Sequence, residues 1–154
     1  MHDPREIFGP IVHIYRSHME YMTKELEAYG IGSGQHDFLL VLYHKDGISQ
    51  ENLARMLKVS KATSTRAIQN LEKEGYVYRQ RDENDLRAYK VYLTEKGKEM
   101  RDIIFEKLVS FIDILFSDFT PEEKEIFRLL TRKAALKFFE PGFEPPSEKL
   151  NDIQ

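Results

Sequence analysis

The chain has 154 residues, of which 41% are hydrophobic, so one domain with a buried core is expected and wholesale disorder is excluded. It contains no cysteine, which excludes disulfides, thiolate metal sites and cysteine redox switches. The net charge is −3, yet residues 55–101 carry 12 Lys and Arg against 7 Asp and Glu, a local charge of +5 that indicates an anionic partner. No apolar run approaches the ~18 residues of a membrane span and no signal peptide is recognisable, so we expect a cytoplasmic protein without membrane contact.

Apolar spacing predicts two helices at the N-terminal end of the chain. The first follows an Asp3–Pro4 cap and extends to Tyr29, with a break or restart expected at Gly9–Pro10. A glycine-rich loop ends it, and Ser33 is the expected cap of a second helix that ends near Lys45.

Two short helices are predicted next, over about 50–57 and 61–74. Ser49 and Ser60 are their expected caps, and Gly75 follows the second helix where a left-handed residue is favoured. The two helices are separated by only a tight turn, which is typical of a helix-turn-helix.

The period of the pattern then changes. Residues 76–81 and 89–93 are rich in aromatic and β-branched residues and predict a β-hairpin with a polar loop. Two further helices, over about 95–119 and 121–139, follow threonine caps. The predicted fold class is therefore mainly α with a small β-hairpin wing, in the order of a winged helix-turn-helix.

The second short helix has the dimensions and side chains to enter a DNA major groove. Its capped N-terminus offers free N–H groups to phosphates, and Arg, Gln, Thr and Lys are residue types that bind bases or phosphates. The candidate DNA-binding residues here are Ser60, Lys61, Thr63, Thr65, Arg66 and Gln69. The alternative interpretation is an ordinary solvated helix face, which the following hairpin and the local charge of +5 disfavour.

Four motifs together resemble the MarR family of transcriptional regulators. They are Ser49-Gln50-Glu51-Asn52-Leu53-Ala54, Leu71-Glu72-Lys73-Glu74-Gly75-Tyr76-Val77, Asp85-Leu86-Arg87 and Val91-Tyr92-Leu93-Thr94-Glu95-Lys96-Gly97. The resemblance implies one MarR-like domain over 1–154, with a winged helix-turn-helix lobe at 33–94, dimerisation helices at 3–29 and 95–139, and a C-terminal tail at 140–154.

The resemblance also assigns the wing. In this family an arginine of the wing enters the minor groove, braced by an aspartate two residues earlier, and the matching residues are Arg87 and Asp85. An arginine on a hairpin tip suits a narrow, negative groove. The alternative is a local surface ion pair worth ~0–1 kcal/mol. The chain departs from the family at Ser64, where an apolar residue is usual, which leaves open which residue of the helix's first turn faces the groove.

The last two predicted helices are rich in phenylalanine, which suggests a further interface. The residues concerned are Phe105, Phe111, Phe116, Phe119, Phe127, Phe138 and Phe139. A self-contained helical core is one explanation. The resemblance implies instead a homodimer whose shared core is built from the first and last helices, and this is the expected arrangement. Such a dimer contacts two half-sites one DNA turn apart, ~34–36 Å.

The resemblance further implies a small-molecule pocket between the two lobes, often for aromatic acids or phenolics. An aromatic carboxylate needs an anion partner beside aromatic walls. The candidate effector-binding residues are His13, Arg16, His18, Tyr43 and His44. The alternative is that each is an ordinary surface residue. No H-x-x-x-H pair is present, so no metal or other cofactor is expected.

The sequence thus predicts a homodimeric DNA-binding transcriptional regulator, a repressor relieved by a small ligand and acting on a palindromic operator. The alternative function is a winged-helix module that binds protein rather than DNA, which Lys61 and Arg66 disfavour. An enzyme is not expected, because the chain has no glycine-rich phosphate loop, G-x-S-x-G or metal motif.

Overall fold

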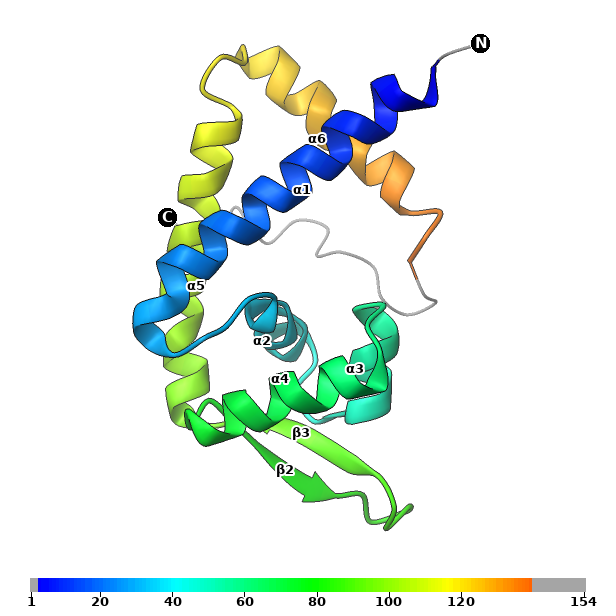
Figure 1. Cartoon of the computed structure of the whole chain (residues 1–154), viewed down its shortest axis with the longest axis vertical. Helices are drawn as coiled ribbons and strands as arrows, with labels where there is room; N and C mark the ends of the chain where they lie inside the picture. Colours follow the sequence, from blue (N-terminus) through cyan, green and yellow to red (C-terminus); the bar gives the residue numbers. More distant parts are fainter. Residues whose placement is uncertain (1–2, 140–154) are drawn as a thin grey trace. The chain divides into compact units, whose positions relative to one another are not determined.

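The computed structural model describes residues 3–139, which form two compact units, one up to residue 114 and the other from residue 115 on. Across the described residues it has six α-helices and a three-stranded antiparallel sheet, which confirms the predicted fold class (Figure 1). The elements are α1 (Pro4–Leu26), a 3-10 turn (Glu27–Tyr29), α2 (Gln35–His44), β1 (Ile48–Ser49), α3 (Gln50–Met56), α4 (Lys61–Lys73), β2 (Val77–Arg81), β3 (Tyr89–Leu93), α5 (Glu95–Leu115) and α6 (Pro121–Ala135). The predicted tail at 140–154 lies outside the described residues. From residue 3 to residue 139, no helix is both long and apolar enough to span a bilayer.

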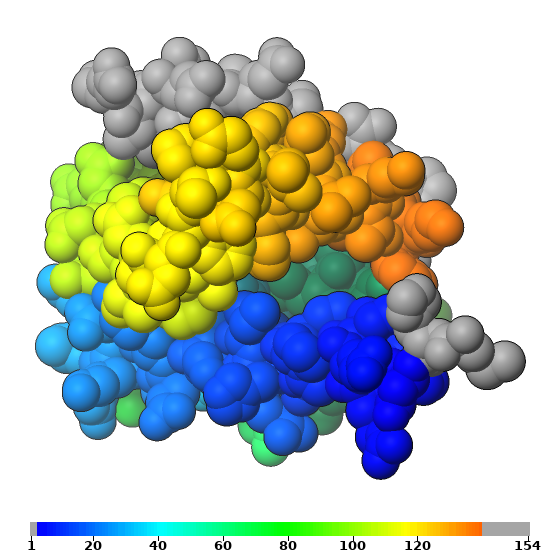
Figure 2. Space-filling model, turned by 90° about the horizontal axis from the view of Figure 1, so that it is seen from above, coloured from blue at the N-terminus to red at the C-terminus, as the bar shows by residue number. Residues whose placement is uncertain are grey.

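Helix α1 begins as predicted, because the Asp3 carboxylate accepts a hydrogen bond from the Arg5 backbone N–H at 2.9 Å. The break expected at Gly9–Pro10 does not occur, and the helix continues through Pro10 to Leu26. Residues 4–13 are all exposed, and Figure 2 shows the dark blue start of α1 at the surface. The carbonyl that loses its N–H partner at Pro10 therefore remains open to solvent. Only the second half of α1 contributes buried side chains, Met22 and Leu26.

Helix α2 supplies much of the core of the first unit. Phe38, Leu39, Val41 and Leu42 are all buried, together with His36. The prediction that Ser33 caps this helix is wrong: the cap position is Gly34, in the left-handed region at φ +72°, and no side chain caps the first turn. The left-handed backbone at Gly34 starts the helix one residue later than the serine signal indicated.

The small sheet contains a strand that the sequence did not predict. The hairpin strands β2 and β3 pair in register, Val77 with Leu93 and Arg81 with Tyr89. Strand β1 pairs with the other edge of β3, Ile48 with Val91, so the strand order is β1-β3-β2. Two residues are too few to show an alternating pattern, which is why β1 escaped prediction. By joining β3 to the start of α3, it ties the wing to the helix-turn-helix.

The last two helices are shorter than predicted. Helix α5 ends at Leu115 rather than near residue 119, and α6 ends at Ala135 rather than near Phe139. After α5 the chain turns, and the rings of Phe116 and Phe119 pack at 5.5 and 5.8 Å from the ring of Phe127. Helix α6 then begins with the predicted capping box, in which Thr120 and Glu123 exchange side-chain-to-backbone hydrogen bonds. The apolar pattern of the sequence continues past the end of α5 because Phe116 and Phe119 pack on Phe127 in the turn after the helix, so the predicted helix was too long.

Candidate nucleic-acid interface

The turn between α3 and α4 sets the direction of α4. The Ser49 hydroxyl caps α3 by accepting from the Asn52 N–H at 3.1 Å. Lys58 in the turn has φ +53°, a left-handed conformation that reverses the chain between the two helices. Ser60 then caps α4, accepting from the Thr63 N–H at 3.1 Å and donating to Thr63 Oγ1 at 2.9 Å. The Ser60 hydroxyl is therefore used to start the helix.

One face of α4 is buried and the opposite face is exposed. Ala67, Ile68 and Leu71 lie in the core, as the periodicity predicts. Four of the six candidate residues have exposed side chains on α4: Lys61, Thr63, Arg66 and Gln69. Thr65 is half-buried and accepts a hydrogen bond from Gln50 Nε2 at 3.1 Å. The exposed residues of α4 thus include three cations, Lys61, Arg66 and Lys73, and no carboxylate.

Ser64 belongs to the buried face. Its side chain is 1% exposed, and among residues 3–139 its hydroxyl has no hydrogen-bond partner. A buried hydroxyl without a partner costs roughly 1–3 kcal/mol. In the first turn of α4, Lys61, Ala62 and Thr63 are exposed instead, so these remain the candidates in that turn for facing a DNA groove.

The wing loop is held by backbone contacts. Asp82 N–H donates to the Ala88 carbonyl at 3.0 Å, and Ala88 N–H donates to the Asp85 carbonyl at 2.9 Å. The Asp85 carboxylate accepts from the backbone N–H of Arg87 at 3.0 Å. Asp85 thus fixes the backbone at Arg87, while the Arg87 side chain extends from the loop and is exposed.

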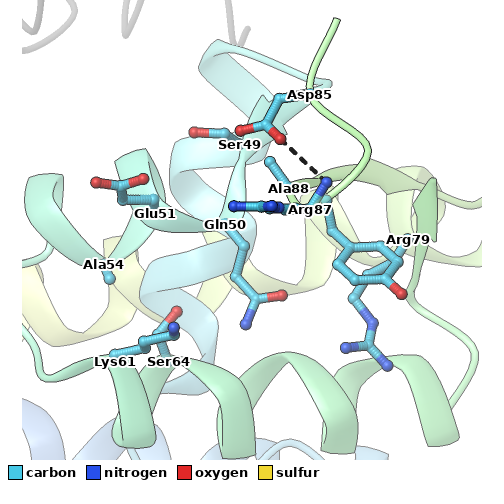
Figure 3. Close-up of a pocket in the computed structure, with 11 residues that line it drawn as sticks. Ser49, Gln50, Glu51, Ala54, Lys61, Ser64, Arg79, Asp85, Arg87 and Ala88 are labelled. Carbon is cyan, nitrogen blue, oxygen red and sulfur yellow. Dashed lines mark hydrogen bonds between the residues drawn. The ribbon is translucent and has the colours of Figure 1, made fainter. Parts of the chain in front are cut away.

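The wing and the helix-turn-helix enclose a groove of about 740 Å³ (Figure 3). Its walls come from the start of α3, from the first turns of α4 and from the wing, and the predicted residues among them are Lys61, Asp85 and Arg87. Sequence reasoning did not select two of its other polar residues, Gln50 and Arg79, as site residues. Arg79 pairs with Glu72 of α4 at 2.8 Å, which fastens β2 to that helix. The Arg79–Glu72 pair and the Gln50–Thr65 hydrogen bond each join residues on different elements, so neither contact can be predicted from periodicity.

The candidate effector residues make different contacts from one another. His13 and Arg16 line a shallow hollow on α1 beside Phe8 and Val12. His18 lies between two rings, 5.6 Å from His36 and 5.0 Å from Phe111.

The other two effector candidates are on α2. The Tyr43 hydroxyl donates to the Gly97 carbonyl at 2.8 Å, and burial raises the pKa of Tyr43 well above its usual range. His44 is exposed at the end of the helix. His18 and Tyr43 are therefore engaged in contacts within the first unit, whereas His13 and Arg16 face outward.

Comparison with known proteins agrees with this geometry. Residues 31–89 match the MarR family model. A MarR transcriptional regulator from Methanosarcina mazei Go1 has a similar structure, with a TM-score of 0.80 and 46% identity over 86% of this chain and 98% of that one. A MarR family regulator from Listeria monocytogenes, solved in complex with 26mer DNA, has a TM-score of 0.78 and 26% identity, with 89% of each chain covered.

Curated relatives agree as well. The HTH-type transcriptional regulator YybA of Bacillus subtilis (strain 168) is 36% identical over 65% of this chain and 67% of its own length. The transcriptional repressor MprA of Escherichia coli (strain K12) is 29% identical over 79% of this chain and 70% of its own length. The chain therefore belongs to the MarR family and is a DNA-binding winged helix-turn-helix transcriptional regulator.

Proposed function

We propose that the chain acts as a homodimeric repressor on a palindromic operator and is released from it by a small ligand. The observation that carries this proposal is the exposed face of α4, with Lys61 and Arg66, beside the exposed Arg87 of the wing. Cations at these places suit a helix in the major groove and a hairpin tip in the adjacent minor groove. Repression is proposed by analogy with the relative that carries that name, MprA.

In this proposal Ser60, Lys61, Thr63, Thr65, Arg66, Gln69, Asp85 and Arg87 form the DNA-binding site. Among them, Ser60 orients the start of α4 through its cap and Asp85 orients the wing backbone, so both act mainly by positioning. Lys61 and Arg66 supply charge to phosphates and base edges. The groups that specify sequence lie on α4, and the wing supplies contact to the flanking minor groove.

The homodimer is proposed from apolar side chains left exposed at the ends of the chain. On α1 these are Ile7, Phe8, Ile11, Val12 and Tyr15, each at least 41% exposed. On α6 they are Ile126, Leu129 and Leu130, each at least 50% exposed. A single exposed apolar residue needs no explanation, but a whole helix face of them is typical of an interface. We therefore assign α1 and α6 to contacts with a second copy, with the lobe at 33–94 left free for DNA.

The base-reading role of α4 is tested with Arg66→Ala. If Arg66 makes a bidentate contact to a base, the change costs ~1–3 kcal/mol on the operator and relaxes preference at one base pair in each half-site. Affinity is measured at fixed salt on the operator and on random duplexes. Arg101→Ala on α5 is the control, and it leaves both affinities unchanged. An equal loss on operator and random DNA makes Arg66 a phosphate contact and removes the base-reading role.

The effector proposal assigns an aromatic carboxylate to His13, Arg16, His18, Tyr43 and His44. Arg16 is the exposed cation of the set, so it is the anion partner. Salicylate is the probe: it should weaken operator binding in a saturable way, and Arg16→Ala should blunt the effect. A ligand weakens operator binding only if its affinity for the DNA-free form of the protein is higher than its affinity for the DNA-bound form. Titration to millimolar salicylate without saturable binding would exclude this ligand class.

A further inference from the structure

A hydrogen bond joins the two helices of the helix-turn-helix at the DNA-binding surface. Gln50, the first residue of α3, donates from Nε2 to Thr65 Oγ1 of α4 at 3.1 Å. Both side chains are half-buried, and Gln50 extends from α3 across the groove toward α4 (Figure 3). Thr65 lies in the second turn of α4, one residue before the exposed Arg66. The bond is thus located beside the exposed face of α4 to which Arg66 belongs.

The direction of this bond determines what Thr65 offers to a partner. A threonine hydroxyl has one proton to donate and two lone pairs that accept. Because Gln50 supplies the proton in the bond between them, the hydroxyl proton of Thr65 points elsewhere. In a helix that proton usually goes to the carbonyl four residues earlier, as it does from Thr23 to Met19 at 2.7 Å and from Thr131 to Phe127 at 2.7 Å.

Thr65 makes no such bond. Among the hydrogen bonds of residues 3–139, no carbonyl, carboxylate or hydroxyl accepts the Thr65 proton. Thr65 therefore has an unused donor on α4, while one of its lone pairs already accepts the hydrogen bond from Gln50. A donor of fixed direction distinguishes bases by their acceptors: purine N7, guanine O6 and thymine O4 accept in the major groove, whereas cytosine N4 offers only hydrogens.

We propose that Gln50 is a positioning residue for base recognition, which fixes Thr65 as a hydrogen-bond donor toward an acceptor on a base edge. Gln50 acts through Thr65 and makes no base contact in this account. The inference rests on the proposed role of α4 in recognising bases. Its consequence is that a residue outside α4 and the wing controls preference at one base pair in each half-site.

The test uses DNA that the wild-type chain itself selects from duplexes with 30 random base pairs. The recovered duplex and a set of single-base-pair variants are then titrated at fixed salt with wild type, Thr65→Val, Gln50→Met and the double variant. Thr65→Val keeps the shape and removes the hydroxyl, and should lower discrimination at one position about fivefold, the worth of one neutral hydrogen bond. Gln50→Met should lower discrimination at that same position and leave the salt dependence unchanged. In the double variant, Gln50→Met should add nothing to Thr65→Val.

Two further variants test the direction of the hydrogen bond and the location of the change. Gln50→Glu keeps the shape but offers only acceptors, so the Thr65 proton turns inward and the same discrimination is lost. Gln80→Met, on an exposed residue of β2, makes the Gln50→Met change where no bond to α4 exists and should leave discrimination unchanged. Thermal melts verify that each variant folds.

Four results would overturn the inference. A uniform loss on every duplex from Gln50→Met means that Gln50 only supports packing. Independent, multiplying effects in the double variant mean that Gln50 contacts DNA itself. If the wild-type chain recovers no preferred sequence, the proposed base recognition fails first and the inference fails with it, whereas selective wild-type binding with silent Gln50 variants refutes the inference alone.

Discussion

His36 is a buried histidine in the core of the first unit. Its side chain is 1% exposed, and within residues 3–139 neither ring nitrogen has a hydrogen-bond partner. Asp37 Oδ1 lies 3.4 Å from Nε2, too poorly oriented for a hydrogen bond. Burial lowers the pKa of His36 to about 4 from its ordinary value of 6.5. Burial, and then the neighbouring His36, also lowers the pKa of His18. The folded chain therefore holds these imidazoles neutral.

This burial predicts a loss of stability in acid. Between pH 6.5 and pH 4 the unfolded chain binds a proton at His36 that the folded chain does not, so the free energy of unfolding falls as the pH falls. His36 alone accounts for roughly 3 kcal/mol over that interval. His36→Leu should flatten the pH dependence of urea unfolding by about this amount, whereas His13→Leu, on the exposed face of α1, should not.

The comparison of the two variants with wild type separates the effect of His36 on the pH dependence of unfolding from the effect of Asp37. Burial raises the pKa of Asp37. The contribution of Asp37 to the free energy of unfolding therefore falls as the pH rises, which is the opposite of the effect of His36. Asp37 and His18 are present in wild type and in both variants. An unfolding free energy whose pH slope is the same in wild type and His36→Leu would contradict the assignment.

Single residues also mark the limit of sequence reasoning at the site. The exposure of Lys61 and Arg66 followed from the helical period, because residues three or four apart share a face. Ser64 shares the period of the buried residues Ala67 and Ile68, but its polar side chain did not mark it as a core residue, and within residues 3–139 its hydroxyl has no partner. The bond from Gln50 to Thr65 spans 15 residues and two elements. Only packing determines such a contact, so no local pattern predicts it.

At the scale of elements, a substitution in the wing can lower DNA affinity without changing the stability of the fold. Arg87→Ala should weaken operator binding by ~1.5–3 kcal/mol, the worth of hydrogen bonds from a charged group. The melting temperature should stay nearly unchanged because the Arg87 side chain is exposed. Preference for A·T-rich flanks should also fall, since those flanks narrow the minor groove. The measurement is affinity for two operators that differ only in their flanks, at fixed salt.

Asp85→Ala supplies the matched comparison. It removes the carboxylate that accepts from the Arg87 backbone N–H, so the loop loosens while the guanidinium remains. Its effect on affinity should have the same sign as that of Arg87→Ala and be smaller. Unchanged affinity for both operators in Arg87→Ala would mean that the wing does not contact the minor groove.

The elements themselves show which signals in the sequence were sufficient. Caps with a specific side-chain bond predicted helix starts at Asp3, Ser49, Ser60 and Thr120. At α2 the presence of Ser33 led to a wrong predicted start, because the left-handed backbone of Gly34 occupies the cap position. Two-residue β1 is defined by pairing to β3 and leaves no trace in local composition. Helix ends were the least predictable, because apolar side chains continued past them.

At the scale of the whole molecule, charge is divided along the chain. The basic residues 55–101 sit within a chain of net charge −3, so the remainder carries net negative charge. In the proposed dimer, two copies of α4, which belongs to the basic segment, face one duplex. This division favours one orientation on DNA through long-range electrostatics. It also predicts that affinity falls as salt rises.

The central claim is that two copies of the chain bind one palindromic duplex together. Sedimentation equilibrium of the chain, alone and with a duplex whose half-sites are ~34–36 Å apart, tests it most directly. The account predicts a species of twice 18.2 kDa in the absence of DNA and two chains on each duplex in its presence, with no significant one-chain complex. A monomer in solution that occupies single half-sites independently would contradict the account.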